Sequence, residues 1–426
     1  MKNLQEQLQA AMDSCRGSME ITHLIELFTH VAFIAKEAPE LFQVIVNTGQ
    51  AKQLGALTDA GKSLENKYPA EVCAAPDQYR VNTKVISVAI ELVSKVEDFN
   101  LLAQLLREFN KNTGRINGEM SSNLNMERIF TALIGDCNGQ SLYDGACGLA
   151  RIASKLNANK MYLEEKNQNT WVTAYRLLTL EGLSFKLNLT DSLTSSTYGM
   201  EDRFDLAVME PPFSLRFGAD ERRMLAESPF IEVPTGNVVS ANSGDSLWIQ
   251  QALSKLNDTG KGYILLPQGF LFRGGYDAKV RAYLLENELL EAVIGLPASI
   301  LDGTAIAPAL LILNKNKPAG SPIKFVDASE IGVFEKSQVE ISEDDSQLIA
   351  NLALGKLADD ERYKEVFIPE IRKQNNELNI SKYIMKDIDI EELDVNEELK
   401  KLSSYQANFE QSQQTLTSLL SKFRHD

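Results

Sequence analysis

The sequence predicts an α/β fold with a mostly parallel sheet, on the strength of two patterns. From about Ser141 onward, short apolar runs such as FDLAVM and ALLILN alternate with helix-length segments such as WVTAYRLLTLEGL. Strands and helices in this alternation form parallel sheets, whose ligands bind beyond the carboxyl ends of the strands. Ahead of this region, residues 18–112 carry apolar side chains at helical spacing and predict an all-helical N-terminal part.

The end of the chain predicts a long helix with a heptad repeat, starting at about Glu391. The two seam positions are occupied by Val395, Leu399, Leu402, Gln406, Phe409, Gln413, Leu416, Leu420 and Phe423. Such a seam can pair with a partner helix in a coiled coil, whereas a terminal helix docked on its own core gives a similar stripe. Both interpretations stay open. We therefore expect three parts, at residues 1–113, 114–345 and 346–426.

Composition narrows the class of protein. The net charge of −16 argues against a protein that holds nucleic acid by bulk electrostatics, so any DNA contact needs a local patch or a partner. No apolar run reaches the roughly 20 residues of a membrane helix. The four cysteines show no paired spacing, and the three histidines lie beside none of them. We expect a cytoplasmic protein without a metal site.

The first two predicted strands end in residues suited to binding a nucleotide-like cofactor. In LYDGACGLARI, Asp144 ends a strand, and Gly145 and Gly148 permit a tight turn before a predicted helix. A single turn of this kind is more often a simple connection. About 20 residues later, KMYLEE ends at Glu164 and Glu165, where a carboxylate can accept ribose hydroxyls or simply face solvent.

The next two strands also end in acids. LNLTDSL places Asp191 after a third strand, and FDLAVMEPPFS places Glu210 after a fourth, directly before a stiff Pro-Pro-Phe turn. Parallel strands bring their carboxyl ends to one edge of the sheet. Four such ends in succession indicate a binding or catalytic site there more strongly than any one of them does.

These motifs resemble those of the modification (M) subunits of Type I restriction-modification systems. Residues 266–317, LPQGFLFRGGYDAKVRAYLLENELLEAVIGLPASILDGTAIAPALLILNKNK, look very like a second catalytic-domain segment of that family. The resemblance covers most of the chain and is strongest from about residue 118 to 320. It implies a Rossmann-like class I methyltransferase sheet and S-adenosylmethionine-dependent methylation of adenine N6 in DNA.

The resemblance also implies partners and site residues. A specificity (S) subunit would read the DNA sequence, and the C-terminal helix could hold that subunit, a restriction subunit or a second M-type subunit. In the family, the adenine is flipped out of the duplex. Oxygens of an Asn/Asp-Pro-Pro-aromatic motif then accept the hydrogens of its amino group, and the aromatic ring stacks on the base. Here that catalytic motif is Glu210, Pro211, Pro212 and Phe213, with the Pro211 carbonyl as second acceptor. The cofactor positions are Asp144, Gly145, Ala146, Gly148, Glu165 and Asp191.

Three departures from the family pattern stand out. Glu210 replaces Asn or Asp; its extra bond displaces the acceptor by about 1.5 Å, and a misplacement near 1 Å can cost about a hundredfold in rate. In the glycine turn, Leu149, Ala150 and Arg151 stand where the family has small residues and could fill cofactor space. Upstream, NGEMSSN keeps Gly118 and Glu119 but lacks the family's aromatic and proline.

These departures leave three hypotheses. In the first, the chain is an M subunit that methylates adenine together with a specificity subunit, with its own catalysis impaired. In the second, it is a pseudoenzyme, a DNA- or protein-binding scaffold that keeps the fold but has lost methyl transfer. A third, a methyltransferase acting on protein or small molecules, fits the N- and C-terminal regions less well.

Overall fold

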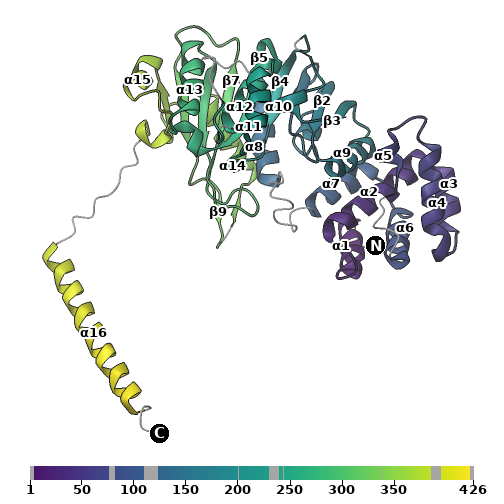
Figure 1. The fold of residues 1–426 in the computed structure, drawn as a ribbon, viewed down its shortest axis with the longest axis horizontal. Coiled ribbons are helices and arrows are strands. Elements are labelled where there is room, and N and C mark those ends of the chain that lie inside the picture. Colours follow the sequence, from purple (N-terminus) through teal and green to yellow (C-terminus); the bar gives the residue numbers. More distant parts are fainter. Residues whose placement is uncertain are drawn as a thin grey trace. The chain divides into compact units, whose positions relative to one another are not determined.

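The chain forms two compact units, Met1–Ile384 and Met385–Asp426. The computed structural model describes residues 4–75, 82–109, 123–199, 201–229, 239–242, 244–336, 338–384 and 395–422. The first unit contains both the helical region and the sheet (Figure 1). The boundary expected near residue 113 therefore stays a prediction, and Gly118 and Glu119 lie outside the described residues.

The N-terminal region is helical, as predicted. Its helices are α1 (Leu4–Cys15), α2 (Ile21–Glu37), α3 (Pro39–Val46), α4 (Gln50–Ser63), α5 (Ala70–Cys73), α6 (Thr83–Val93), α7 (Phe99–Phe109) and α8 (Leu124–Ile134). In α2, every residue from Leu27 to Ala35 is buried. A helix with apolar side chains all round is stable only when other elements cover all its faces. Accordingly, α2 packs against α6, α7 and α9 (Gln168–Glu181).

Nine strands form one sheet within the described residues, in the order β11-β8-β6-β7-β5-β4-β1-β2-β3. They are β1 (Ser141–Asp144), β2 (Lys160–Glu165), β3 (Phe185–Leu189), β4 (Phe204–Met209), β5 (Leu256–Pro267), β6 (Leu290–Gly295), β7 (Pro308–Asn314), β8 (Ile323–Asp327) and β11 (Tyr363–Val366). Strands β3, β2, β1, β4 and β5 pair in parallel, whereas β7 and β11 run antiparallel to their neighbours. The predicted α/β fold is confirmed, with a sheet that is mixed rather than wholly parallel.

Helices and two short strands complete the first unit. The helices are α10 (Ser192–Ser195), α11 (Ala219–Glu227), α12 (Gly244–Lys255), α13 (Tyr276–Glu286), α14 (Glu343–Ala353) and α15 (Ile368–Lys373), with 3-10 turns at Ala153–Lys155, Gln268–Leu271 and Ile380–Lys382. Strands β9 (Val333–Phe334) and β10 (Val339–Glu340) form a separate antiparallel pair. The helix expected directly after the glycine turn is only the three-residue 3-10 turn at Ala153–Lys155.

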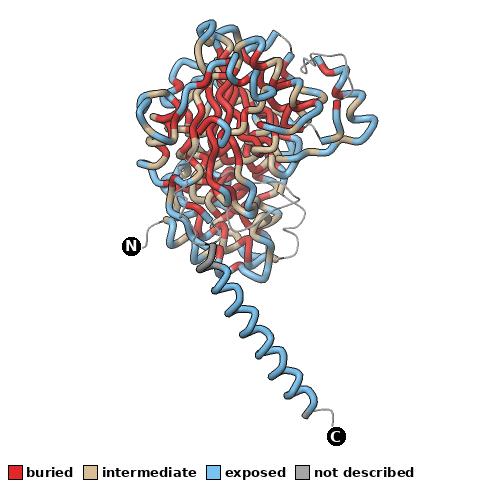
Figure 2. The backbone as a smooth tube through the Cα atoms, turned by 90° about the vertical axis from the view of Figure 1, so that its left-hand side faces the viewer, coloured by how far each residue is buried: buried red, intermediate tan, exposed pale blue. Residues whose placement is uncertain are grey.

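The buried residues are concentrated inside the first unit (Figure 2). The sheet is buried on both faces, and each face has its own hydrophobic cluster. Neighbouring strand residues point to opposite faces, so Leu142 joins one cluster and Tyr143 the other. The first cluster continues from the sheet through α9 into the N-terminal helices. The second is covered by α12, α13 and α15. The helical region and the sheet therefore share one core.

Three positively charged side chains, each buried or half-buried, connect α9 to the N-terminal helices through hydrogen bonds or ion pairs. Arg176, fully buried in α9, donates to the carbonyls of Val72 (2.9 Å) and Ala74 (2.7 Å). Lys36 donates to the carbonyls of residues 179 and 180 at the end of α9, at 2.8 and 2.9 Å. The third cation, on α7, contacts the glycine turn and is described below.

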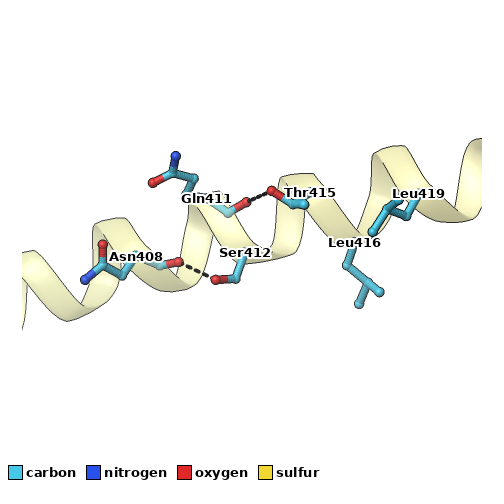
Figure 3. Close-up of a pocket in the computed structure, with 6 residues that line it drawn as sticks. All are labelled: Asn408, Gln411, Ser412, Thr415, Leu416 and Leu419. Atoms are coloured by element: carbon cyan, nitrogen blue, oxygen red, sulfur yellow. Dashed lines mark hydrogen bonds between the residues drawn. The ribbon is translucent and has the colours of Figure 1, made fainter.

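The C-terminal unit contains α16 (Val395–Lys422), a continuous helix in the place predicted for one. Residues 399–421 are all exposed, including the seam residues Leu402, Phe409 and Leu416 (Figure 2). Phe423 lies outside the described residues. An open depression runs along one side of the helix from Asn408 to Leu419 (Figure 3). It lies on a single helix and does not form an enclosed cavity. Within the described residues, no helix is long and apolar enough to cross a membrane.

The buried guanidinium of Arg176 yields a stability prediction. Arg176→Met leaves the carbonyls of Val72 and Ala74 without their donor, so we expect the free energy of unfolding to fall by about 3 kcal/mol. Urea denaturation of the full chain measures this change. Lys52→Met, at an exposed position of α4, is the matched control and should change it by less than about 0.5 kcal/mol. Equal effects of the two variants would contradict the assigned role of Arg176.

Candidate functional site

The acidic residues singled out in the sequence lie at one edge of the sheet. Asp144 is the last residue of β1, and Glu165 is the last residue of β2. Asp191 lies two residues after the end of β3, and Glu210 directly follows β4. These strands are neighbours in the order β4-β1-β2-β3 and are parallel, so their carboxyl ends meet on the same side. The structure thus brings the predicted residues to a common edge; their roles stay predictions.

The glycine turn after β1 is held by hydrogen bonds from its own amides. The amide of Ala146 donates to Asp144 Oδ1 at 3.0 Å, and that of Gly148 donates to Glu165 Oε2 at 3.0 Å. Gly145 is buried, and a Cβ atom there would lie 2.7 Å from the Tyr143 hydroxyl, so no larger residue fits. Gly148 has a left-handed backbone with φ +54°, and the space beside it is open.

Two further carboxylates flank this turn. Glu165 accepts a second backbone bond, from the Asn167 amide to Oε1 at 2.7 Å, which leaves lone pairs on both of its oxygens. Asp191 caps α10 by accepting from the Leu193 amide at 3.1 Å, while its other oxygen pairs with Lys166 at 2.8 Å. Both carboxylates are therefore oriented by backbone donors and can still accept further hydrogen bonds.

Leu149, Ala150 and Arg151, the residues of the turn expected to fill cofactor space, are accommodated by neighbouring elements. The Arg151 side chain is buried and pairs with Glu127 of α8 at 3.0 Å. Leu149 is half-buried and packs against the first hydrophobic cluster. Ala150 adopts the left-handed conformation, φ +54°, that a glycine would adopt without strain. These contacts hold the three side chains in place around the turn.

The Pro-Pro-Phe turn follows β4 without a break. Glu210 is half-buried, Pro211 is buried, and Pro212 and Phe213 are half-buried, with Phe213 packed against the first hydrophobic cluster. Ser214 then takes a left-handed conformation (φ +57°), and its amide lies 3.5 Å from a carboxylate oxygen of the buried Asp245. The strand end, the two prolines and this last contact fix the course of the backbone at the edge of the sheet.

Like charges face one another at this site. Burial raises the pKa of Asp144 well above its ordinary value, and the carboxylates of Glu210 and Glu165 raise it further, against the opposing effect of the Ala146 amide. Burial also raises the pKa of the Cys147 thiol, with added repulsion from Asp144 and Glu165. A cation placed among Asp144, Glu165 and Glu210 would relieve this repulsion, so the charge pattern suits a positively charged ligand.

Sequence reasoning missed the role of Glu164, for which it considered only binding of ribose hydroxyls or exposure to solvent at a strand end. Glu164 is fully buried and accepts from the Tyr143 hydroxyl at 2.6 Å and from the Thr197 amide at 2.7 Å. Gln251 bonds the same tyrosine hydroxyl, and the buried Lys255 bonds the Tyr198 carbonyl. Burial lowers the pKa of Lys255 to about 8, although Glu164 opposes the shift. In the sequence, the only sign of this burial is that strand side chains alternate between the two faces of the sheet.

S-adenosylmethionine fits this set of residues. Open space borders Gly148, and Arg151 is bound to Glu127 instead of extending freely across the turn. Carboxylates at the ends of β1, β2 and β4 match the positive charge of the cofactor's sulfonium. Among the residues described, no group of three or more His, Cys, Asp or Glu side chains is arranged to hold a metal ion.

Comparison with known proteins assigns the chain to a family. Residues 100–392 match the N-6 DNA Methylase family. The Type I restriction enzyme MpnII methylase subunit of Mycoplasma pneumoniae is 26% identical over 312 residues, covering 68% of this chain and 57% of the relative. The MjaVIII methylase subunit of Methanocaldococcus jannaschii is 29% identical over 321 residues, covering 69% and 55%. The chain thus spans little more than half the length of these relatives.

Solved structures share the fold. A type I restriction-modification methyltransferase subunit from Streptococcus thermophilus aligns with a TM-score of 0.74 at 20% identity, over 89% of this chain and 99% of that one. A chain solved in a study of assembly and conformational transition of the type I R-M system aligns with a TM-score of 0.66 over 98% of both chains, at 19% identity. The chain therefore belongs to the N-6 DNA Methylase family, as a homologue of Type I restriction-modification methylase subunits.

Proposed function

We propose that this chain is an M-type subunit that binds S-adenosylmethionine at the glycine turn and methylates adenine N6 in DNA slowly, together with a specificity subunit. One observation carries the proposal: Asp144, Glu165 and Glu210 are gathered beside a turn that leaves open space at Gly148. Family membership supplies the reaction class. Substrate, partner and rate are inferences from these residues and from the relatives.

The cofactor is held by the residues around the turn in this proposal. Glu165 and Asp191 offer carboxylate oxygens already oriented by backbone amides, and Gly148 lets the ligand approach the backbone closely. Asp144 and Glu210 supply negative charge near the sulfonium. When bound, S-adenosylmethionine supplies an electrophilic methyl group. The chain's own contribution is to orient this group and to exclude competing water.

Glu210 limits the rate in this proposal. The target amino group donates two hydrogen bonds, and the Glu210 carboxylate and the Pro211 carbonyl are the two acceptors at the loop. Both oxygens of Glu210 accept only, so the chemistry of the acceptor is kept. The extra methylene shifts it by about 1.5 Å relative to Asp or Asn, which is enough to cost about a hundredfold in rate. Phe213, half-buried at this loop, is the aromatic side chain proposed to stack on the flipped base.

A second candidate function, a scaffold without methyl transfer, has one observation in its favour. Arg151 and Glu127 form an ion pair between the glycine turn and α8, with side chains only 5% and 16% exposed. If the methionine part of the cofactor needs that position, the pair would compete with it. The two candidates differ in one measurable property, because the scaffold does not bind S-adenosylmethionine.

The partner surface in the proposal is α16. Its exposed apolar residues repeat with the heptad spacing of a coiled coil. Gln406 and Gln413 interrupt this apolar seam, and polar residues at such positions specify the register of the paired helices at a cost in stability. The net charge of −16 makes the chain a poor DNA-binding protein by itself. A specificity subunit held at α16 would supply the sequence readout and much of the affinity for DNA.

The charge pattern predicts a pH-dependent affinity for S-adenosylmethionine. A cation beside Asp144 favours its ionised form, so binding releases a proton, and affinity rises with pH until the pH exceeds the raised pKa of Asp144. Glu210→Gln removes one like charge, which lowers the pKa of Asp144. We expect this variant to bind S-adenosylmethionine more weakly, and its affinity to rise over a lower pH range than that of the unaltered chain. Calorimetric titration in buffers of different ionisation enthalpy measures both quantities. Glu227→Gln, exposed on α11, is the control; identical pH profiles for all three proteins would refute the assignment.

Replacing the acceptor predicts a faster enzyme. Glu210→Asn restores a side chain one bond shorter, so methyl transfer should accelerate at least about tenfold. The assay is transfer of labelled methyl from S-adenosylmethionine to adenine in unmethylated DNA, by the full chain with its co-purified specificity subunit. The same exchange at exposed Glu227 serves as control. An unchanged or lower rate, with cofactor binding retained, would mean that Glu210 is not what limits catalysis.

The heptad seam predicts which substitutions release the partner. Leu416→Glu places a charge in the apolar seam of α16 and should lower the amount of co-purified specificity subunit by about tenfold or more. Gln411→Glu introduces the same side chain on the opposite side of the repeat and should have no effect. Affinity purification of the co-expressed pair gives the ratio of the two chains. Loss of partner from both variants, or from neither, would contradict the proposed seam.

A further inference from the structure

The glycine turn is contacted by a side chain from the N-terminal helices. Arg107, on α7, donates from Nε to the carbonyl of Leu149 at 2.9 Å. The two residues are 42 positions apart in the sequence. The guanidinium also forms a two-pronged ion pair with Glu181 at the end of α9, with the Nη2–Oε2 distance at 2.8 Å. The turn, α7 and the end of α9 are thus joined through one guanidinium.

This contact acts on the most constrained peptide of the turn. The Leu149 carbonyl belongs to the peptide unit that leads into Ala150, and rotation of that unit changes the φ angle of Ala150. Ala150 is left-handed (φ +54°), as is Gly148 on the other side of Leu149. For a residue with a Cβ atom this conformation costs about 1–2 kcal/mol. It persists only where neighbouring groups hold the backbone in place.

The guanidinium is itself rigidly placed. The side chains of Arg107 and Glu181 are only 2% and 4% exposed, so both charges have left water and depend on each other. An arginine fork bonded on one edge by a carboxylate has little freedom left, and its Nε–H direction is fixed. The Leu149 carbonyl therefore accepts from a donor that does not adapt to other conformations of the turn.

The bond also lies beside the ligand-binding part of the turn. Gly148, directly before Leu149, borders open space and donates its amide to Glu165. If the Leu149 carbonyl is released, the chain can relax at Leu149 and Ala150, and a displacement of the Leu149 Cα atom would carry the adjoining Gly148 backbone with it and weaken its bond to the predicted ribose-binding carboxylate. On the far side, Arg151 is fixed by Glu127 of α8. Helices of the N-terminal half thus hold the turn from both ends.

We propose that Arg107 is a positioning residue for the cofactor turn, so that the N-terminal helical region sets the affinity for S-adenosylmethionine by holding the Leu149 carbonyl. This inference rests on the proposed function for its effect on affinity, and on the described contacts for its effect on the turn. Arg107 acts through the backbone and does not touch the cofactor. The helical region is then part of the binding site, although it contributes no ligand contact.

The experiment compares conservative variants of the full chain. Arg107→Lys keeps the positive charge but loses the planar guanidinium, which donates to the Leu149 carbonyl and to Glu181 at the same time. Glu181→Gln keeps the shape but frees the guanidinium, and it serves if Arg107→Lys does not fold. Arg176→Lys is the matched control, because Arg176 is a buried arginine bonded to carbonyls that are remote from the turn. Two readouts apply: the dissociation constant for S-adenosylmethionine by calorimetry, and hydrogen exchange of the turn amides without ligand.

Expected and contradicting results are distinct. In Arg107→Lys and Glu181→Gln, hydrogen exchange of the amides of residues 146–150 should become at least about tenfold faster. The affinity of both variants for S-adenosylmethionine should weaken by a similar factor. Arg176→Lys should change only the thermal stability. Unchanged exchange in both site variants, or equal change in Arg176→Lys, would overturn the positioning role. If the unaltered chain binds no S-adenosylmethionine, the proposed function fails; the exchange measurement still decides whether Arg107 holds the turn.

Discussion

Mutual repulsion among three carboxylates is the constraint around which the site is organised. Asp144, Glu165 and Glu210 face one another because β1, β2 and β4 are parallel neighbours, and burial makes each negative charge costly. Backbone amides offset this cost: residues 146, 148 and 167 all donate to these acids. The amides of residues 146 and 148 reach the acids because the chain turns sharply after β1, where a Cβ atom at Gly145 would lie 2.7 Å from the Tyr143 hydroxyl. The turn thus places two of these donors beside the acids, and a positively charged ligand would relieve the repulsion that remains.

The helical region and the sheet are coupled by a small number of buried polar contacts. Arg176 and Lys36 bond carbonyls between the N-terminal helices and α9, and Arg107 extends the connection to the glycine turn. The shared hydrophobic cluster excludes water from these contacts, which strengthens them. A shift of the N-terminal helices would consequently reach the glycine turn through the backbone. The turn itself is held by the contacts of Arg107 with Leu149 and of Arg151 with Glu127.

Local patterns were sufficient to predict much of the fold. Alternating apolar runs predicted the α/β sheet, and the heptad predicted α16, because both signals depend on neighbours a few residues apart. The predicted acids at the strand ends lie on one edge, as parallel pairing requires. The antiparallel course of β7 depends on distant pairing and was not predictable. The burial of Glu164 and the contact of Arg107 with Leu149 were not predictable either, because both depend on contacts between residues far apart in the sequence.

If the proposed site accepts S-adenosylmethionine with Leu149, Ala150 and Arg151 in the turn, the ligand should be visible there. The most direct test is diffraction from crystals of the full chain grown with S-adenosylmethionine. The account predicts ligand density beside Gly148, within hydrogen-bonding distance of Glu165 and Asp191, with the sulfonium nearest Asp144 and Glu210 and with Arg151 still bound to Glu127. Empty density at this edge at saturating ligand, or Arg151 and Leu149 occupying the space instead, would contradict this expectation and favour the scaffold.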